Sequence, residues 1–101
     1  MPLSDLRIRQ TKLDPEASRP IRLFDGQGLY IELTPSGSKL WRFKYRFDGR
    51  EKRLALGVYP QVGLKEARSR RDEAKSLLAG GIDPSAVRQQ KRREQAARTR
   101  L

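Results

Sequence analysis

The chain has 101 residues, of which 36% are hydrophobic, so it is long enough for one small domain with a modest core. Its 23 lysines and arginines against 12 aspartates and glutamates give a net charge of +11, which is typical of proteins that bind a polyanion, nucleic acid above all. The absence of cysteine and histidine excludes disulfides, thiolate zinc sites and the most common general base, so we expect no metal, no cofactor and no small-molecule ligand.

The first twenty residues predict a short helix followed by an extended connector. Ser4 can cap a helix over residues 5–12, whereas Pro15 and Pro20 favour an extended chain after it. Residues 1–5 do not begin a signal peptide, and no stretch approaches the length of a transmembrane helix. We therefore expect a soluble cytoplasmic protein with no membrane partner.

Residues 21–56 predict an antiparallel β-sheet, because apolar and polar residues alternate and turn sequences at residues 25–28, 35–38 and 48–49 separate the alternating runs. The pair Asp48-Gly49 fits a two-residue type I′ turn, in which both central residues need a positive φ. This turn fixes the register of the last hairpin. The predicted pairs are Phe47 with Arg50, Arg46 with Glu51, Lys44 with Arg53, Phe43 with Leu54, Arg42 with Ala55 and Trp41 with Leu56.

Directly opposed residues lie on the same side of a sheet, so this register sorts the hairpin into two faces. The apolar face consists of Trp41, Phe43, Leu54 and Leu56, and the cationic face of Arg42, Lys44, Arg46 and Arg53. In the preceding hairpin, a loop over residues 35–39 sets Leu33 opposite Trp41 and Ile31 opposite Phe43, which keeps the faces consistent. Tyr30, Glu32 and Thr34 then join the cationic face.

Two helices are expected after the sheet. Residues 64–79 predict a helix that Gly63 caps and Gly80-Gly81 ends. Its apolar stripe, which can cover the apolar face of the sheet, consists of Leu64, Ala67, Ala74 and Leu78, flanked by Leu77. Asp83 followed by Pro84 predicts the start of a basic linker helix, whose charge suits either a soluble linker or non-specific attraction to phosphate.

The predicted fold class is therefore α+β. A small antiparallel sheet of three to four strands is packed on one face by an α-helix, with a short amino-terminal helix and a basic carboxy-terminal linker helix. We expect a domain over residues 1–84 and a basic linker over residues 85–101.

The cationic face is the strongest candidate for a binding site. Lys44 opposite Arg53 is unfavourable by some tenths of a kcal/mol, and a phosphate backbone would compensate for it. A solvated outer face is the alternative, but the excess of cations on it favours duplex DNA. Tyr30 could stack on a base or be an ordinary surface residue. Aromatic residues occupy alternate positions of the strand, at Trp41, Phe43, Tyr45 and Phe47, so their rings are expected on the apolar face. This favours a place in the core over base stacking.

No group of residues has the pattern of a catalytic site. The carboxylates are scattered, Ser36 and Ser38 have no neighbouring base, and residues 25–28 are better explained as a turn than as a phosphate-binding loop. We expect no enzymatic activity of this chain.

Five motifs, taken together, resemble a known family. They are Asp25-Gly26-Gln27-Gly28-Leu29-Tyr30, Pro35-Ser36-Gly37-Ser38-Lys39-Leu40-Trp41-Arg42-Phe43-Lys44-Tyr45-Arg46, Leu54-Ala55-Leu56-Gly57-Val58-Tyr59-Pro60, Leu64-Lys65-Glu66-Ala67-Arg68 and Leu77-Leu78-Ala79-Gly80-Gly81-Ile82-Asp83-Pro84. Their order is similar to that in the amino-terminal arm-binding domain of prophage and genomic-island integrases, of the tyrosine recombinase class. Gly63 departs from the serine usual at this helix cap.

The resemblance implies a module that binds arm-type sites on double-stranded DNA, with three strands in the major groove, alongside other integrase protomers. It also implies that strand exchange belongs to a carboxy-terminal domain with an Arg, Lys and His set and a tyrosine nucleophile. We expect that domain to be absent here, so Tyr30, Tyr45 and Tyr59 are not candidates for the nucleophile. The chain would be a fragment of a bacterial protein encoded by a prophage or genomic island.

We therefore expect Arg42, Lys44, Arg46 and Arg53 to dock on duplex DNA, with Tyr30 and Thr34 beside them. Two alternatives remain open. The same charge would suit an RNA-binding or ribosome-associated protein, and a protein-interaction module could pair protomers through its helix or tail.

Overall fold

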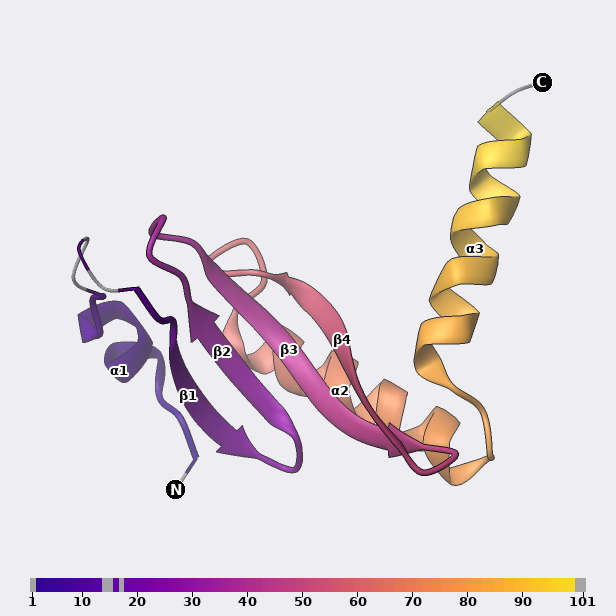
Figure 1. The fold of residues 1–101 in the computed structure, drawn as a ribbon, viewed down its shortest axis with the longest axis horizontal. Helices are drawn as coiled ribbons and strands as arrows, with labels where there is room; N and C mark the ends of the chain where they lie inside the picture. The colour runs from indigo at the N-terminus through magenta and orange to yellow at the C-terminus, as the bar shows by residue number, and fades with distance from the viewer. Residues whose placement is uncertain (1, 14–15, 17, 100–101) are drawn as a thin grey trace.

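The structure is a computed structural model that describes residues 2–13, 16 and 18–99, and it confirms the α+β fold class. Four antiparallel strands form one sheet in the order β1-β2-β3-β4, and helix α2 lies behind this sheet in Figure 1. Helix α1 lies beside β1, and α3 projects away from the sheet. The elements in chain order are α1 (Asp5–Gln10), β1 (Ile21–Gly26), β2 (Leu29–Leu33), β3 (Lys39–Phe47), β4 (Arg50–Val58), α2 (Leu64–Ala79) and α3 (Pro84–Thr99).

Helix α1 begins as predicted, with the backbone N–H of Arg7 donating to Ser4 Oγ at 3.2 Å. It ends at Gln10 rather than at residue 12, because Thr11 adopts an extended conformation and its hydroxyl donates to the carbonyl of Arg7 at 2.7 Å. Ile8 is fully buried, so this helix contributes to the core. Pro15, which supported the predicted connector, lies outside the described residues.

The β1–β2 hairpin turns at Gln27 and Gly28, which have φ of 54° and 87°. Asp25 precedes the turn, at a bulge of β1 between Phe24 and Gly26. Gly28 is required here for a second reason. A Cβ at this position would lie 2.5 Å from the carbonyl oxygen of Lys44, because the backbone N–H of Lys44 donates to Gly28 O at 2.8 Å.

The β2–β3 register differs from the prediction by two residues. Leu33 pairs with Lys39 and Ile31 with Trp41, so the loop covers residues 34–38 instead of 35–39. Thr34 belongs to this loop because its backbone N–H donates to Ser38 O at 2.9 Å. A shift of two residues returns every side chain to the same face, so the predicted division into faces is unchanged.

The β3–β4 register is as predicted from Phe47–Arg50 to Arg42–Ala55, but Trp41 pairs with Gly57 instead of Leu56. A bulge between Trp41 and Arg42 inserts Leu56 as an extra residue of β4. Gly57 has a φ of 129°, and a Cβ there would lie 2.4 Å from Val62 Cγ2. The Trp41 indole N–H donates to Val62 O at 2.7 Å, so the chain after β4 folds back tightly onto the sheet.

The core lies between the back of the sheet and α2. Trp41 is fully buried and Phe43 is 3% exposed, as the alternation predicted. Helix α2 has the predicted bounds and buries Ala67 and Ala74 against this face. The remaining buried hydrophobic residues that form the core with them are Leu3, Ile8, Leu23, Leu29, Ile31, Leu33, Tyr45, Leu54, Leu56 and Val62.

Helix α3 begins at Pro84 as predicted, with the backbone N–H of Ser85 donating to Asp83 Oδ1 at 3.0 Å. The same carboxylate accepts from the Tyr45 hydroxyl at 2.6 Å and from the Lys52 ammonium, so it also attaches the start of α3 to the sheet. Among the described residues, no helix is long and apolar enough to cross a lipid bilayer.

Candidate nucleic-acid interface

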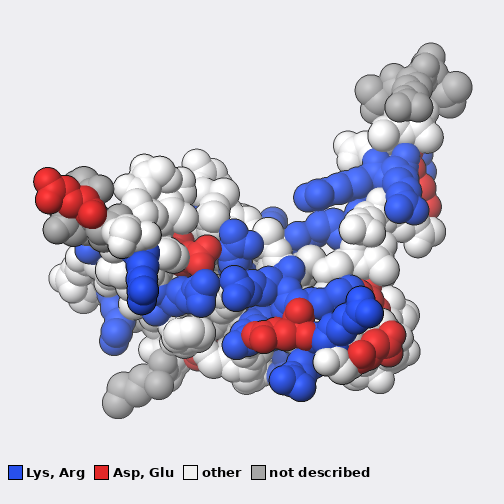
Figure 2. All heavy atoms as spheres, viewed as in Figure 1, with Lys and Arg blue, Asp and Glu red and all other residues white. Residues whose placement is uncertain are grey.

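The face of the sheet opposite α2, called the front face below, is a strongly charged surface of the molecule. In the part of the chain that the structure describes, no helix covers it (Figure 1). Figure 2 looks onto this face and shows lysine and arginine side chains spread across it, with a few carboxylates among them. By register, it consists of Arg22, Phe24, Tyr30, Glu32, Leu40, Arg42, Lys44, Arg46, Glu51, Arg53, Ala55 and Val58.

Glu32 holds two of the front-face arginines. Its Oε1 accepts from Arg22 Nε and its Oε2 from Arg42 Nε, both at 3.1 Å. Burial favours the neutral form of Glu32, but the hydrogen bond from Arg22 and the charge of Arg42 outweigh it and leave its pKa lowered. Arg42 is therefore fixed through its Nε, while the terminal nitrogens of its guanidinium remain for a ligand.

Lys44 lies opposite Arg53, as predicted, and the structure shows what offsets their repulsion. Glu51 accepts from Lys44 Nζ at 2.7 Å from a diagonal position on β4. The hydrogen bond and charge of Lys44 lower the pKa of Glu51, and Arg53 and Arg46 contribute further. The like-charge pair is thus partly compensated within the sheet, so it is weaker support for a bound phosphate than the sequence indicated.

Arg46 and Arg53 are the front-face cations with the most freedom. Both are exposed, and among the described residues they make no hydrogen bond or ion pair. Their guanidinium groups lie on neighbouring strands, since Arg46 pairs with Glu51 two residues from Arg53. Two uncommitted arginines side by side can donate to phosphates or to guanine edges without breaking an internal contact.

Tyr30 and Thr34 are placed differently from the prediction. Tyr30 is on the front face but only 2% exposed, so the expectation of an exposed ring is wrong. The ring centroids of Phe24 and Tyr30 are 5.4 Å apart, and Cζ of Arg22 lies 5.9 Å from the ring centroid of Tyr30. Thr34 lies in the loop after β2, where its hydroxyl accepts from Ser38 N at 3.2 Å and is therefore engaged in the turn.

Sequence reasoning missed two residues that lie on this face. Arg22 and Phe24 belong to β1, and Phe24 is 59% exposed beside the cations. The signal for both was present, because Ile21 and Leu23 alternate with them in the predicted sheet region.

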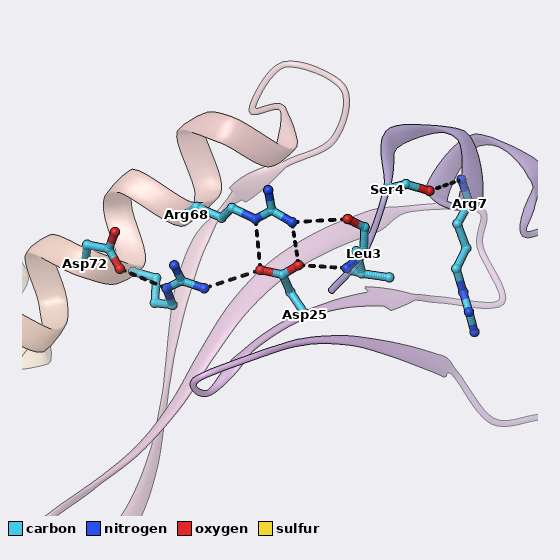
Figure 3. A network of polar contacts seen from close by, with 7 residues as sticks. Leu3, Ser4, Arg7, Asp25, Arg68 and Asp72 are labelled. Carbon is cyan, nitrogen blue, oxygen red and sulfur yellow. Dashed lines mark hydrogen bonds and ion pairs between the residues drawn. The ribbon is translucent and has the colours of Figure 1, made fainter. Parts of the chain in front are cut away.

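A second charged cluster is structural (Figure 3). Asp25 accepts from Arg68 Nε at 3.0 Å, Arg68 Nη2 at 2.8 Å, Arg71 Nη1 at 3.3 Å and the backbone N–H of Leu3 at 2.8 Å. These hydrogen bonds, led by those from Arg68, lower the pKa of Asp25 although burial opposes them. The carboxylate is 3% exposed and its partners surround it, so the cluster holds β1, α2 and the amino-terminal segment together.

The sequence matches the family described as "Arm DNA-binding domain" over residues 3–91. This chain belongs to the arm DNA-binding domain family. The match confirms the resemblance drawn from the motifs, and the matched residues of this arm DNA-binding domain include the front face and the first turns of α3.

Curated relatives of this arm DNA-binding domain are integrases of phages and prophages. The chain is 46% identical to the integrase of Enterobacteria phage P4 over 95 residues, which are 92% of this chain and 22% of that protein. It is 40% identical to the prophage integrase IntA of Escherichia coli (strain K12) over 101 residues, 97% of this chain and 24% of that protein. The integrase of Shigella phage Sf6 is 40% identical over 79 residues, 78% of this chain and 20% of that protein. The chain thus spans about a fifth to a quarter of the length of these relatives.

Proposed function

We propose that this chain is the DNA-binding domain of a phage-type integrase, which recognises arm-type sites and positions the recombinase for site-specific integration or excision. Membership of the arm DNA-binding domain family supports the proposal. The structural observation that carries it is the front face, which no described helix covers and on which Arg46 and Arg53 make no hydrogen bond or ion pair with another described residue.

The front-face cations would divide the work of binding. Arg46 and Arg53 would contact DNA directly, and Arg42 would use the guanidinium nitrogens that Glu32 leaves free. Lys44 would exchange Glu51 for a phosphate when the duplex arrives. Tyr30 would act indirectly, by supporting the exposed ring of Phe24, and Thr34 would lie at the end of the contact.

In the whole protein, the recombination chemistry would lie outside the region that this chain matches. The relatives are named integrases, and the chain corresponds to about a fifth of their length. This domain would act in the cytoplasm, where the attachment-site DNA is, together with other integrase protomers on the same DNA. The family match favours this function over the RNA-binding and the protein-interaction alternatives.

In vitro selection from randomised duplexes, followed by fluorescence anisotropy with the 101-residue chain, tests the proposal. We expect an enriched sequence that binds more tightly than unrelated duplex DNA and structured RNA at the same salt concentration. Arg46→Ala and Arg53→Ala should each weaken this binding, whereas Lys65→Ala, an equal loss of charge at an exposed position of α2 behind the sheet, should not. Equal affinity for RNA and duplex DNA, or unchanged binding by both front-face variants, would overturn the proposal.

A further inference from the structure

The outer edge of β4 is covered by two arginines from different helices. Because β4 is the last strand of the sheet, its outward backbone groups have no neighbouring strand among the residues that the structure describes. Arg88 of α3 donates through Nη1 to the carbonyl of Ala55, and Arg70 of α2 donates through Nη1 to the carbonyl of Leu56 at 2.8 Å. Each interaction uses one of five guanidinium donors, so several donors remain at this edge.

These arginines belong to a concentration of positive charge. Arg70, Arg88 and Lys91 line one groove of about 280 Å³ between β4, α2 and α3, against one carboxylate, that of Glu73, and an apolar floor that includes Leu54 and Leu56. Burial and the charges of Arg92 and Arg70 lower the pKa of Arg88, which shows that the cations lie close enough to repel one another. Arg70 is paired with Glu66, but within the described ranges Arg88, Lys91 and Arg92 make no ion pair.

The place of this cluster relative to the front face suits the backbone of a duplex. Three spacings of about 4.8 Å make a four-stranded sheet about 14 Å wide, whereas the major groove is about 12 Å wide. The outer strands of the sheet would therefore lie against the phosphate chains on either side of the groove. Ala55, whose carbonyl Arg88 contacts, is two residues from Arg53 on β4, so the cluster begins at the edge of the sheet that borders the charged front face.

We propose that Arg88, Lys91 and Arg92 of α3, with Arg70 of α2, form a phosphate-binding site along the outer edge of β4. The site holds one strand of the DNA backbone while the front face lies in the groove. It gives the basic α3 helix a defined contact with DNA in place of general electrostatic attraction. The inference rests on the proposed function, because it supplies a second contact to the same duplex.

Salt-dependent binding of the 101-residue chain to the selected duplex tests this site. Lys91→Ala and Arg92→Ala remove charges that make no hydrogen bond or ion pair with another described residue, so both variants should unfold at the wild-type temperature. If each loss removes one phosphate contact, the slope of log K against log salt should fall by about 0.9, and the affinity by up to about eightfold near 0.1 M salt. Arg93→Ala is the matched control, since residue 93 points away from Lys91 on α3.

A second measurement locates the contact on the DNA. Single phosphates of the selected duplex are replaced in turn by neutral methylphosphonates. At one or two positions beside the groove, the neutral substitution should weaken binding of the wild type. The same substitution should not weaken binding of Lys91→Ala further, because this variant has already lost the contact. If the wild type binds and both variants keep its slope and its methylphosphonate profile, the edge site is wrong while the proposed function stands. If the wild type does not bind duplex DNA, both are wrong.

Discussion

Asp25 and Arg68, which are 43 positions apart in the sequence, form a two-point ion pair at 2.8 and 3.0 Å. The arginine also donates to the carbonyl of Leu3 at 3.1 Å, so this one side chain of α2 joins β1 to the amino-terminal segment. The pair thereby fixes how α2 lies behind the sheet, and with it which face of the sheet is left for DNA (Figure 3).

The Asp25→Asn substitution should destabilise the domain by about 3 kcal/mol, because two arginines and a backbone N–H would lose a charged acceptor. The value is at the lower end for buried pairs, since the side chain of Arg68 is 37% exposed. Glu66→Gln, in an exposed helical pair with Arg70, is the control and should cost less than about 0.5 kcal/mol. Urea denaturation measures both, and equal effects would show that the Asp25 network is not the link between sheet and helix.

Stability should fall in acid in a way that depends on Asp25. The pKa of Asp25 is lowered from its ordinary value of 3.8, chiefly by Arg68, so the carboxylate contributes stability that is present above this value and lost as the pH falls through the folded-state pKa. Glu32 and Asp83 also have lowered pKa values and act in the same direction. The free energy of unfolding should therefore drop more steeply below about pH 4 in the wild type than in Asp25→Asn. Parallel pH profiles of the two proteins would contradict this assignment.

Local sequence signals predicted the sheet well where a turn fixed the register. Asp48-Gly49 sets every pair from Phe47–Arg50 to Arg42–Ala55. The prediction failed at Leu56, because the bulge there depends on Gly57 lying against Val62, a contact that no alternation reports. It failed by two residues at the β2–β3 loop because Thr34 suits both a strand and a turn.

The candidate site was predictable as a face but not as a set of free side chains. The alternation of residues along the strands predicted that Arg42, Lys44, Arg46 and Arg53 share one face. It did not predict the ion pairs of Arg42 and Lys44, because these are made with residues on neighbouring strands. Tyr30 was expected to be exposed because the cover that Phe24 and Arg22 provide comes from β1, and the alternating pattern alone does not set the register of β1 against β2. Long-range ion pairs such as Asp25–Arg68 leave no periodic signal in a single sequence.

Removing a carboxylate from the front face should strengthen DNA binding. Glu51→Gln frees Lys44 and removes a negative charge next to Arg46 and Arg53, so duplex DNA should bind more tightly and the salt slope should rise by up to about 0.9. Arg53→Ala should change both quantities in the opposite direction. Thermal unfolding should show only a small loss of stability in Glu51→Gln, because both side chains of this pair are about half exposed. Weaker binding by Glu51→Gln would show that DNA does not approach this face.

Gly28→Ala should be far more destabilising than Gly37→Ala, although both glycines have a positive φ. At Gly37 the added Cβ meets open space, so only the backbone strain of about 1 to 2 kcal/mol applies. At Gly28 the Cβ would lie 2.5 Å from Lys44 O, which adds a steric cost and gives about 2 to 5 kcal/mol in total. Equal urea midpoints for the two variants would mean that β2 and β3 approach each other less closely at this turn.

The attachment of α3 to the sheet should depend on Asp83. Asp83→Ala removes the acceptor for Ser85 N and for the Tyr45 hydroxyl, so it should lower stability by about 1 to 2 kcal/mol, the usual cost of losing a helix cap. Lys52→Ala leaves the cap intact and removes only a partly exposed ion pair, so it should cost clearly less than Asp83→Ala. Amide hydrogen exchange should quicken in the first turn of α3 in Asp83→Ala alone. Because Lys91 and Arg92 lie on this helix, Asp83→Ala should also lower the salt slope of DNA binding. A slope equal to that of the wild type would show that α3 is positioned by Arg88 rather than by its cap.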